Sequence, residues 1–168
     1  MIKKTNGLTL IECLIVIALS CILLFSAAMA YQKFVNKNQL NTLVEKLSDA
    51  LEYARDEAIT SQSTISFCPK NEDETCGSDW QNGQLILDEK NKQVLRVLPP
   101  TPNQYHLTWC STLGDSSELR WRSDGFTRGQ QGSFFICERK AHQKLSAQII
   151  VLRTGRLRVV MGEIPGCD

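Results

Sequence analysis

The pattern of apolar and polar residues divides the chain into three stretches, the first of which ends in a long apolar run. Residues 1–7 are basic and polar, and the run from Leu8 to Ala30 contains Glu12 as its one charged residue. The run has 23 residues, and a helix needs about 20 to cross a bilayer. Lys3 and Lys4 precede it and favour a cytoplasmic N-terminus. We therefore expect a membrane-spanning helix over residues 8–30, with the later residues beyond the inner membrane.

Residues 31–62 show the spacing of an amphipathic helix. Apolar residues recur there every three or four positions, which is typical of one buried helix face; they are Leu40, Leu43, Val44, Leu47, Ala50, Leu51, Ala54 and Ala58. The polar residues between them, among them Arg55, are expected to face solvent. No proline or glycine occurs from Leu8 to Gln62. The sequence predicts one continuous helix from Leu8 to Thr60, roughly 80 Å long at ~1.5 Å per residue.

From residue 63 onward the period changes to that of short strands. Apolar, β-branched and aromatic runs alternate with clusters of Gly, Asn, Asp and Pro, which mark turns. The predicted strands are Thr64–Cys68, Gln84–Leu87, Gln93–Leu98, Tyr105–Cys110, Glu118–Arg122, Ser133–Cys137, Leu145–Leu152 and Arg156–Met161. One helix followed by antiparallel strands is an α+β arrangement. We expect a long N-terminal helix packed on a β-rich globular head formed by residues 63–168.

Charge is balanced overall but unevenly placed. The chain has 19 Lys and Arg against 18 Asp and Glu. Residues 31–100 hold 8 basic and 11 acidic residues, whereas residues 101–168 hold 9 and 6. A basic excess near the C-terminus favours an anion-binding surface there. His106 and His142 have no evident nucleophile partner, and we find no metal-ligand spacing or phosphate-binding glycine loop. We expect no enzymatic activity, no metal and no cofactor.

Cysteines are numerous for a chain of this length: Cys13, Cys21, Cys68, Cys76, Cys110, Cys137 and Cys167. The first two lie in the apolar run and are expected to act as small apolar residues. The other five lie in the exported part, where an oxidising compartment favours disulfides. We predict the disulfides Cys68–Cys76 and Cys137–Cys167, with Cys110 free and buried. A Cys110–Cys137 disulfide remains an alternative, because spacing does not determine connectivity.

The N-terminal motif Gly7-Leu8-Thr9-Leu10-Ile11-Glu12 resembles the type IV prepilin signature. The resemblance implies that a prepilin peptidase cuts after Gly7 and that the new N-terminal residue, Leu8, is N-methylated. The family usually has Phe where Leu8 stands. The resemblance also implies that Glu12 pairs with the terminal amine of a neighbouring subunit. Such a pair explains a carboxylate in an apolar run, because opposite charges attract strongly at low dielectric.

The rest of the chain resembles the FimT/GspH group of minor pilins and pseudopilins. The resemblance rests on short motifs in a fixed order: Ile65–Cys68, Cys76, Trp80–Gly83, Ser123–Gly125, Phe134–Cys137 and Thr154–Arg158. It implies a pilus or secretion-pseudopilus component. Such a protein is anchored in the inner membrane with its head in the periplasm, and it later joins other pilins in a fibre at the cell surface.

A cluster of arginines lies near the C-terminus. Residues 152–157 are typical of two strands joined by a two-residue turn at Thr154-Gly155. That register places Arg153 opposite Arg156 and Val151 opposite Arg158. Side-chain alternation then puts the three arginines on one face, and Leu152, Leu157 and Val159 on the other. Guanidinium groups suit phosphate oxygens, so the face favours a polyanionic partner. Arg139, Lys140 and Lys144 would extend it if the fold brings them near.

The motif Gly155-Arg156-Leu157-Arg158 matches a Gly-Arg-x-Arg motif that binds DNA in FimT members linked to natural transformation. The resemblance implies this role for Arg156 and Arg158. Trp109 and Trp121 could add base stacking, although core positions suit both better. We expect a minor pilin that binds double-stranded DNA without sequence preference. The alternative is a structural pseudopilin of a type II secretion system, or a pilus-priming subunit, whose basic hairpin serves solubility or subunit contacts.

Overall fold

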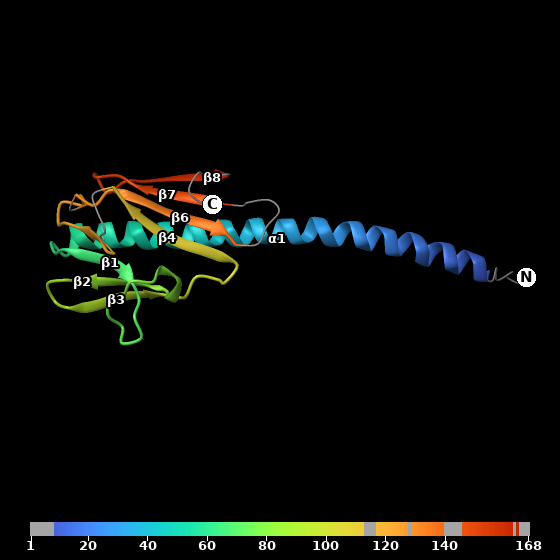
Figure 1. Ribbon diagram of the computed structural model, residues 1–168, viewed down its shortest axis with the longest axis horizontal. Helices are drawn as coiled ribbons and strands as arrows, with labels where there is room; N and C mark the ends of the chain where they lie inside the picture. The colour runs from blue at the N-terminus through green and yellow to red at the C-terminus, as the bar shows by residue number, and fades with distance from the viewer. Residues whose placement is uncertain (1–8, 113–116, 128, 140–145, 163, 165–168) are drawn as a thin grey trace, which may run out of the picture. The chain divides into compact units, whose positions relative to one another are not determined.

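The computed structural model describes residues 9–112, 117–127, 129–139, 146–162 and 164, with backbone alone at residues 26–30 and 33. Its elements are α1 (Leu10–Thr60), β1 (Ile65–Pro69), η1 (Trp80–Asn82), β2 (Gln84–Asp88), β3 (Gln93–Leu98), β4 (Tyr105–Ser111), β5 (Leu119–Trp121), β6 (Gly132–Glu138), β7 (Ser146–Val151) and β8 (Leu157–Gly162) (Figure 1). Each of the eight predicted strands is present, and each boundary lies within one residue of the predicted one. The fold class is α+β, as predicted. The chain forms two compact units, residues 1–39 and 40–168.

The first unit contains the start of α1, which is capped by Thr9 and Glu12. The Glu12 N–H donates to Thr9 Oγ1 and the Thr9 N–H donates to Glu12 Oε2, both at 3.4 Å. This reciprocal pair is a capping box, and it satisfies two backbone donors that a helix start leaves without partners. The capping box explains why the helix begins at Leu10.

No helix within the described residues is both long and apolar enough to cross a membrane. The predicted membrane-spanning segment, residues 8–30, includes Leu8 and the side chains of residues 26–30, which lie outside the described part. The predicted span is therefore not confirmed and stays a prediction.

The second unit begins with the last part of α1, whose buried face is the predicted one. Seven of the eight predicted residues are buried, and Leu43 is half-buried against them. The helix ends at Thr60 because Gln62 adopts a left-handed conformation, with φ of 50°. The Gln62 side-chain amide donates to the carbonyl oxygen of Ile59 at 2.7 Å, which satisfies one carbonyl of the last turn.

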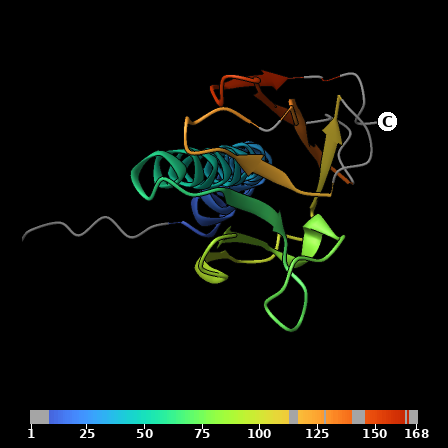
Figure 2. The ribbon, with the colours of Figure 1, turned by 90° about the vertical axis from the view of Figure 1, so that its left-hand side faces the viewer.

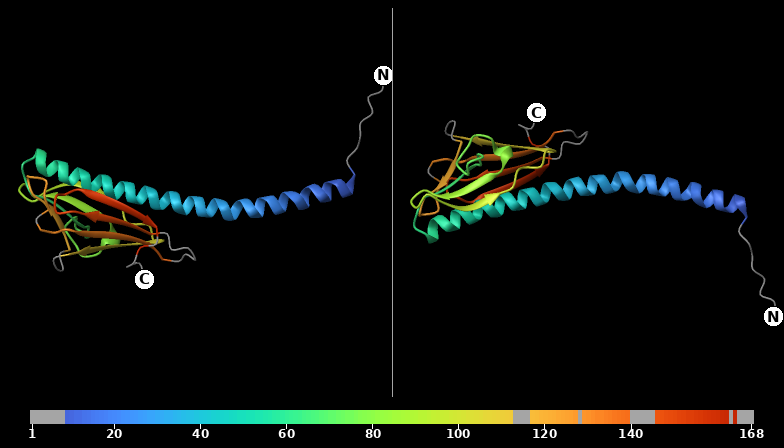
Figure 3. Two further views of the ribbon diagram at one scale, coloured as in Figure 1. Left: turned by 90° about the horizontal axis from the view of Figure 1, so that it is seen from above. Right: turned by 90° about the horizontal axis from the view of Figure 1, so that it is seen from below.

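Two antiparallel sheets complete the head. Their strand orders are β3-β2-β1-β5 and β4-β6-β7-β8. Both sheets share one hydrophobic core with residues 40–58 of the helix. In both views of Figure 3 the strands lie on one side of the teal part of α1, and Figure 2 shows this part next to both sheets. Among the described residues the buried apolar side chains lie between Leu40 and Ile164, so the second unit contains its own core.

Aromatic rings fill the space between the sheets. Trp80 lies 5.5 Å from Phe67 and 5.0 Å from Phe134, measured between ring centroids. Trp109 packs on the other side of Phe134 at 4.4 Å. Trp109 is 8% exposed and Trp121 is fully buried. Both tryptophans therefore belong to the core, as expected.

The structure contains the predicted Cys68–Cys76 disulfide, with the two Cα atoms 5.5 Å apart. Cys137 is also disulfide-bonded, and its predicted partner, Cys167, lies outside the described residues. Cys110 is free, which excludes the alternative Cys110–Cys137 pair.

The prediction that Cys110 is buried was wrong, because its side chain is exposed. Side chains alternate along β4, where Tyr105, Leu107 and Trp109 are buried. Cys110 therefore points to the outer face. The sequence prediction judged the thiol by its apolar character and did not consider which face of the strand it occupies.

Candidate nucleic-acid interface

The predicted arginine hairpin exists, but its turn differs from the predicted one. The Leu152 N–H donates to the Arg156 carbonyl at 2.9 Å, and the Gly155 N–H donates to the Leu152 carbonyl at 2.8 Å. Gly155 has φ of 76°, which is the left-handed region. These contacts describe a three-residue loop, Arg153-Thr154-Gly155, with a glycine bulge. The two-residue turn predicted at Thr154-Gly155 was wrong, because the glycine is the third loop residue and not the second.

The longer loop shifts the strand register by one residue. Val151 lies opposite Leu157, and Ile150 lies opposite Arg158. The predicted pairs, Arg153 with Arg156 and Val151 with Arg158, are therefore absent. A shift of one residue moves a side chain to the other face of a sheet. Arg158 consequently shares the outer face with Ile150.

The orientation of the Leu152 side chain also differs from the predicted one. It was predicted to point toward the core, but it lies opposite Arg156 and is 45% exposed. Leu157 packs against the core and lies opposite the buried Val151, as predicted. Val159 lies opposite the buried Ile149 but is itself 43% exposed, so the prediction that it points toward the core was wrong. Arg156 and Arg158 therefore share one face, as predicted, whereas Arg153 belongs to the turn.

The turn is packed closely against the rest of the head. Gly155 is buried, and a Cβ atom there would meet the carbonyl oxygen of Gly125 and lie 2.8 Å from Arg55 Nε. The Thr127 N–H donates to the Arg153 carbonyl at 3.0 Å. The turn is thus held by α1 and by the segment that follows β5. Glycine is required at position 155 both by its φ and by these contacts.

The three hairpin arginines are exposed and have no carboxylate partner among the described residues. The ion pairs formed by the described side chains join Arg120 to Glu89 and Glu118, and Arg122 to Asp124. None of the described ion pairs involves Arg153, Arg156 or Arg158. Their charges are therefore available to an anionic ligand.

Arg55 contributes a fourth guanidinium at the base of the turn. Its Nε donates to the Gly125 carbonyl at 3.3 Å, and its side chain is half-buried. The sequence placed Arg55 on a solvated helix face, because no local pattern showed that two turns distant in sequence would pack there. Only the tertiary structure brings Arg55 to the hairpin.

The basic residues before β7 do not extend the patch within the described part of the chain. Lys140 and Lys144 lie outside it. Arg139 is exposed and follows β6, and its Nη2 lies 3.4 Å from His106 Nδ1. The hairpin lies at the opposite end of β6, where Gly132 pairs with Val151. The six-residue separation between Gly132 and Glu138 spans roughly 20 Å, so Arg139 is remote from the turn.

The structure describes only one of the three residues that are expected to take part in processing and assembly. Gly7 and Leu8 lie outside the described residues. Glu12 takes part in the capping box within the chain. The predicted pairing of Glu12 with a neighbouring subunit remains a prediction.

Comparison with known proteins gives two family matches. The model of type II transport protein GspH matches residues 43–155. The model of the prokaryotic N-terminal methylation motif matches residues 2–28. Among curated proteins none matches the chain.

Two crystal structures of the type IV minor pilin FimU from Pseudomonas aeruginosa (strain PAO1) are similar to the chain. For the form in space group P21 the identity is 20% and the TM-score is 0.59, covering 76% of this chain and 92% of that chain. For the form in P65 the values are 20% and 0.56, covering 72% and 92%. At this identity the likeness shows a shared fold, the pilin-like α+β arrangement.

Proposed function

The chain belongs to the family of type II transport protein GspH and contains the N-terminal methylation motif, and on this premise we propose that it is a minor type IV pilin that binds DNA. The family identifies it as a minor pilin or pseudopilin, a non-enzymatic subunit. The motif implies a membrane-anchored precursor that a prepilin peptidase processes and that assembles with other pilins.

The observation that supports DNA binding is the exposed arginine hairpin. Within the described part of the chain Arg153, Arg156 and Arg158 have no carboxylate partner, and their turn is fixed by Gly155 and Arg55. A rigid turn loses little conformational entropy on binding. Guanidinium groups bind phosphate oxygens without reading bases, so the ligand is the backbone of double-stranded DNA. Uptake of DNA in natural transformation is the process that such a subunit would serve.

Affinity for DNA should be low for each subunit. Three phosphate contacts give a slope of log K against log salt of about −2.7. Several subunits, or one subunit beside other DNA-binding pilins, raise the total affinity through multivalency.

The same proposal includes the processing and the membrane anchoring of the precursor. The peptidase cuts after Gly7, Leu8 becomes the methylated N-terminus, and residues 8–30 anchor the subunit in the inner membrane with the head in the periplasm. Glu12 then binds the terminal amine of a neighbour in the fibre. In the isolated chain its carboxylate instead contacts the Thr9 N–H.

A structural role is the second candidate. The GspH match ends at residue 155, so it includes Gly155 but neither Arg156 nor Arg158. A type II secretion pseudopilin or a priming subunit would need the docked turn, since Gly155 is buried against Gly125 and Arg55, without needing the two arginines for DNA.

The test is a titration of the isolated head, residues 33–168, with duplex DNA at two salt concentrations, followed by NMR shift perturbation. We expect salt-sensitive shifts centred on residues 153–158. The variant Arg156→Gln/Arg158→Gln should lower the salt slope to about −0.9, because one phosphate contact remains.

The matched control is Arg96→Gln/Arg139→Gln, which removes two exposed arginines outside the hairpin and should leave the shifts in place. Absence of shifts in the folded head at low salt would favour the structural role. Equal weakening by both double variants would show that net charge, and not the hairpin, attracts the DNA.

A further inference from the structure

Strand β4 lies at the edge of the second sheet, and its hydrogen-bonding pattern determines which of its groups face outward. The Thr112 N–H donates to the Gln131 carbonyl, and the Arg139 N–H donates to the Gln104 carbonyl, both at 2.9 Å. In an antiparallel pair, residues alternate between bonding the partner strand and pointing away from it. The even-numbered residues of β4 therefore bond to β6. The backbone groups of Tyr105, Leu107 and Trp109 point away from the sheet.

The first part of this edge is already covered. The Tyr105 N–H donates to the Pro102 carbonyl at 2.9 Å. The side-chain amide of Gln81 lies along the edge, with its Nε2 3.4 Å from the Leu107 carbonyl oxygen. Gln81 thus takes the place of a neighbouring strand beside Leu107. This cover ends before Trp109.

Trp109 is left with three polar groups that have no partner in the described structure. Its backbone N–H and C=O take part in no hydrogen bond among the described residues. Its indole Nε1 is buried and also lacks a partner, although the side chain is only 8% exposed. A buried polar group without a partner costs about 1–3 kcal/mol, and native proteins seldom leave several at one residue.

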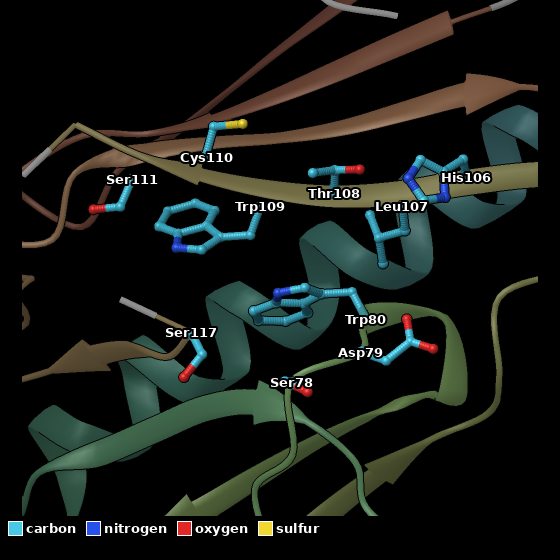
Figure 4. Close-up of a pocket in the computed structure, with 10 residues that line it drawn as sticks. All are labelled: Ser78, Asp79, Trp80, His106, Leu107, Thr108, Trp109, Cys110, Ser111 and Ser117. Atoms are coloured by element: carbon cyan, nitrogen blue, oxygen red, sulfur yellow. The ribbon is translucent and has the colours of Figure 1, made fainter. Parts of the chain in front are cut away.

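These groups lie beside a cavity of about 780 Å³ between β4 and η1. Figure 4 shows the rings of Trp80 and Trp109 extending into it, with Ser117 and Ser78 across from β4. The indole nitrogen of Trp109 is on the side of the ring that faces Ser117, whereas Cys110 points away. The cavity is therefore lined by two tryptophan side chains, next to the edge groups of Trp109 that have no partner among the described residues.

We propose that the edge of β4 at Trp109 is a strand-addition site for an extended segment of another protein chain. One residue of that segment exchanges both backbone hydrogen bonds with Trp109, as in an antiparallel ladder. Directly opposed residues place their side chains on the same face, so the side chain of that residue enters the cavity beside Trp80.

Charge also restricts the occupant. Among the ten residues that line the cavity, Asp79 provides a carboxylate, and none is Lys or Arg. A segment with an apolar central residue and a basic residue at its end fits this lining. In a fibre, a neighbouring subunit could supply such a segment. The site lies on a strand other than the arginine hairpin, so the proposal does not depend on DNA binding.

The experiment uses the full chain in detergent micelles, labelled with ¹⁵N. The probe is the acetylated and amidated peptide Lys-Val-Thr-Val-Thr-Val-Lys. The control peptide has the same sequence with alternate backbone nitrogens methylated, which blocks pairing along one edge. Backbone pairing depends little on partner sequence, so the simple probe should bind in the millimolar range.

The expected result is a downfield shift and slower hydrogen exchange of the Trp109 backbone amide, together with a changed shift of the Trp109 indole signal, because a side chain of the probe enters the cavity beside the ring. The Trp121 indole signal should not move. The NMR spectrum of Trp109→Phe lacks one indole N–H signal, and this loss assigns the signal to Trp109. Ser117→Arg, which fills the cavity, should weaken the probe about tenfold or more, the loss expected for roughly one good hydrogen bond. The control Ser123→Arg introduces the same side chain at an exposed position that does not line the cavity. This variant should bind the probe with the affinity of the wild type.

Three results would overturn the proposal. They are failure of the folded chain to bind the probe at millimolar concentration, equal binding of the methylated peptide, and binding that leaves the Trp109 signals unchanged.

Discussion

The guanidinium of Arg55 donates to the carbonyl oxygen of Gly125 at 3.3 Å, and this contact fixes the base of the arginine hairpin. Arg55 comes from the helix, and Gly125 from the turn after β5. Gly155 packs against both, close enough that a Cβ atom there would contact each of them. The hairpin is therefore positioned by residues that are 30 to 100 positions away in the chain.

Replacement of Gly155 by alanine should destabilise the head. The residue has φ of 76°, and its Cβ would meet a backbone oxygen and Arg55. A left-handed conformation in a non-glycine residue costs about 1–3 kcal/mol, and the contacts add to this cost. Urea unfolding of wild type and Gly155→Ala, followed by circular dichroism, measures the difference.

Gly162→Ala separates the two causes. Gly162 also has positive φ, 133°, but a Cβ there would meet nothing within 4 Å. We expect Gly162→Ala to lose less stability than Gly155→Ala. Equal losses would mean that the backbone conformation, and not the contact with Gly125, determines the effect.

The Cys68–Cys76 disulfide should contribute to stability through a short loop. The two cysteines are 8 positions apart. Closing a loop of this size is worth about 2.5 kcal/mol in the chain-entropy account. The variant Cys68→Ser/Cys76→Ser should lower the free energy of unfolding by about this amount, measured in urea without reductant.

Serine substitution is preferable to a reducing agent, because reduction would also open the disulfide of Cys137. Cys110→Ser is the matched control, since this thiol is free and exposed. A double variant as stable as Cys110→Ser would show that the bridge does not stabilise the fold.

Asp88 should make the stability of the head dependent on acid pH. Burial by itself raises the pKa of this carboxyl, but hydrogen bonds outweigh it, and the pKa is lowered below the ordinary 3.8. The donors are the backbone N–H groups of Lys90 and Asn91 and the side chains of Asn91 and Ser63. The carboxylate therefore stabilises the fold above about pH 4 and loses this contribution as the pH falls through its lowered pKa.

Asp88→Asn should reduce stability near neutral pH and flatten its decline below about pH 4. Thermal unfolding across this range is the measurement. Asp73→Asn, at an exposed position in the loop before Cys76, is the control and should leave the wild-type profile in place. A profile for Asp88→Asn parallel to that of the wild type would contradict the assigned role of Asp88.

Local pattern was sufficient to predict much of this fold. The spacing of Leu40, Val44 and Leu47 identified the buried helix face, because a helix repeats every 3.6 residues whatever it packs against. The strands were recognisable from turn residues and β-branched runs, which act over a few positions. The Cys68–Cys76 pair was also local, since a short loop joins the two residues.

Other features depended on contacts between distant segments. The division of the strands into two sheets and the position of Arg55 have no signal in a local window. The hairpin illustrates the limit, because Thr154-Gly155 suits a two-residue turn by composition. The observed turn includes Arg153, whose carbonyl accepts the Thr127 N–H, so a hydrogen bond from another loop supports the longer form.

The sequence alone determined the order of elements, the apolar N-terminal run, the Gly-Arg-x-Arg motif and the family. Only the tertiary structure decided which face each arginine occupies, that Cys110 is exposed and that Trp109 lies unpaired at a sheet edge. The physical reason is that periodicity and turn chemistry act between near neighbours. Register, burial and unpaired strand edges depend on how distant strands and the helix pack against one another.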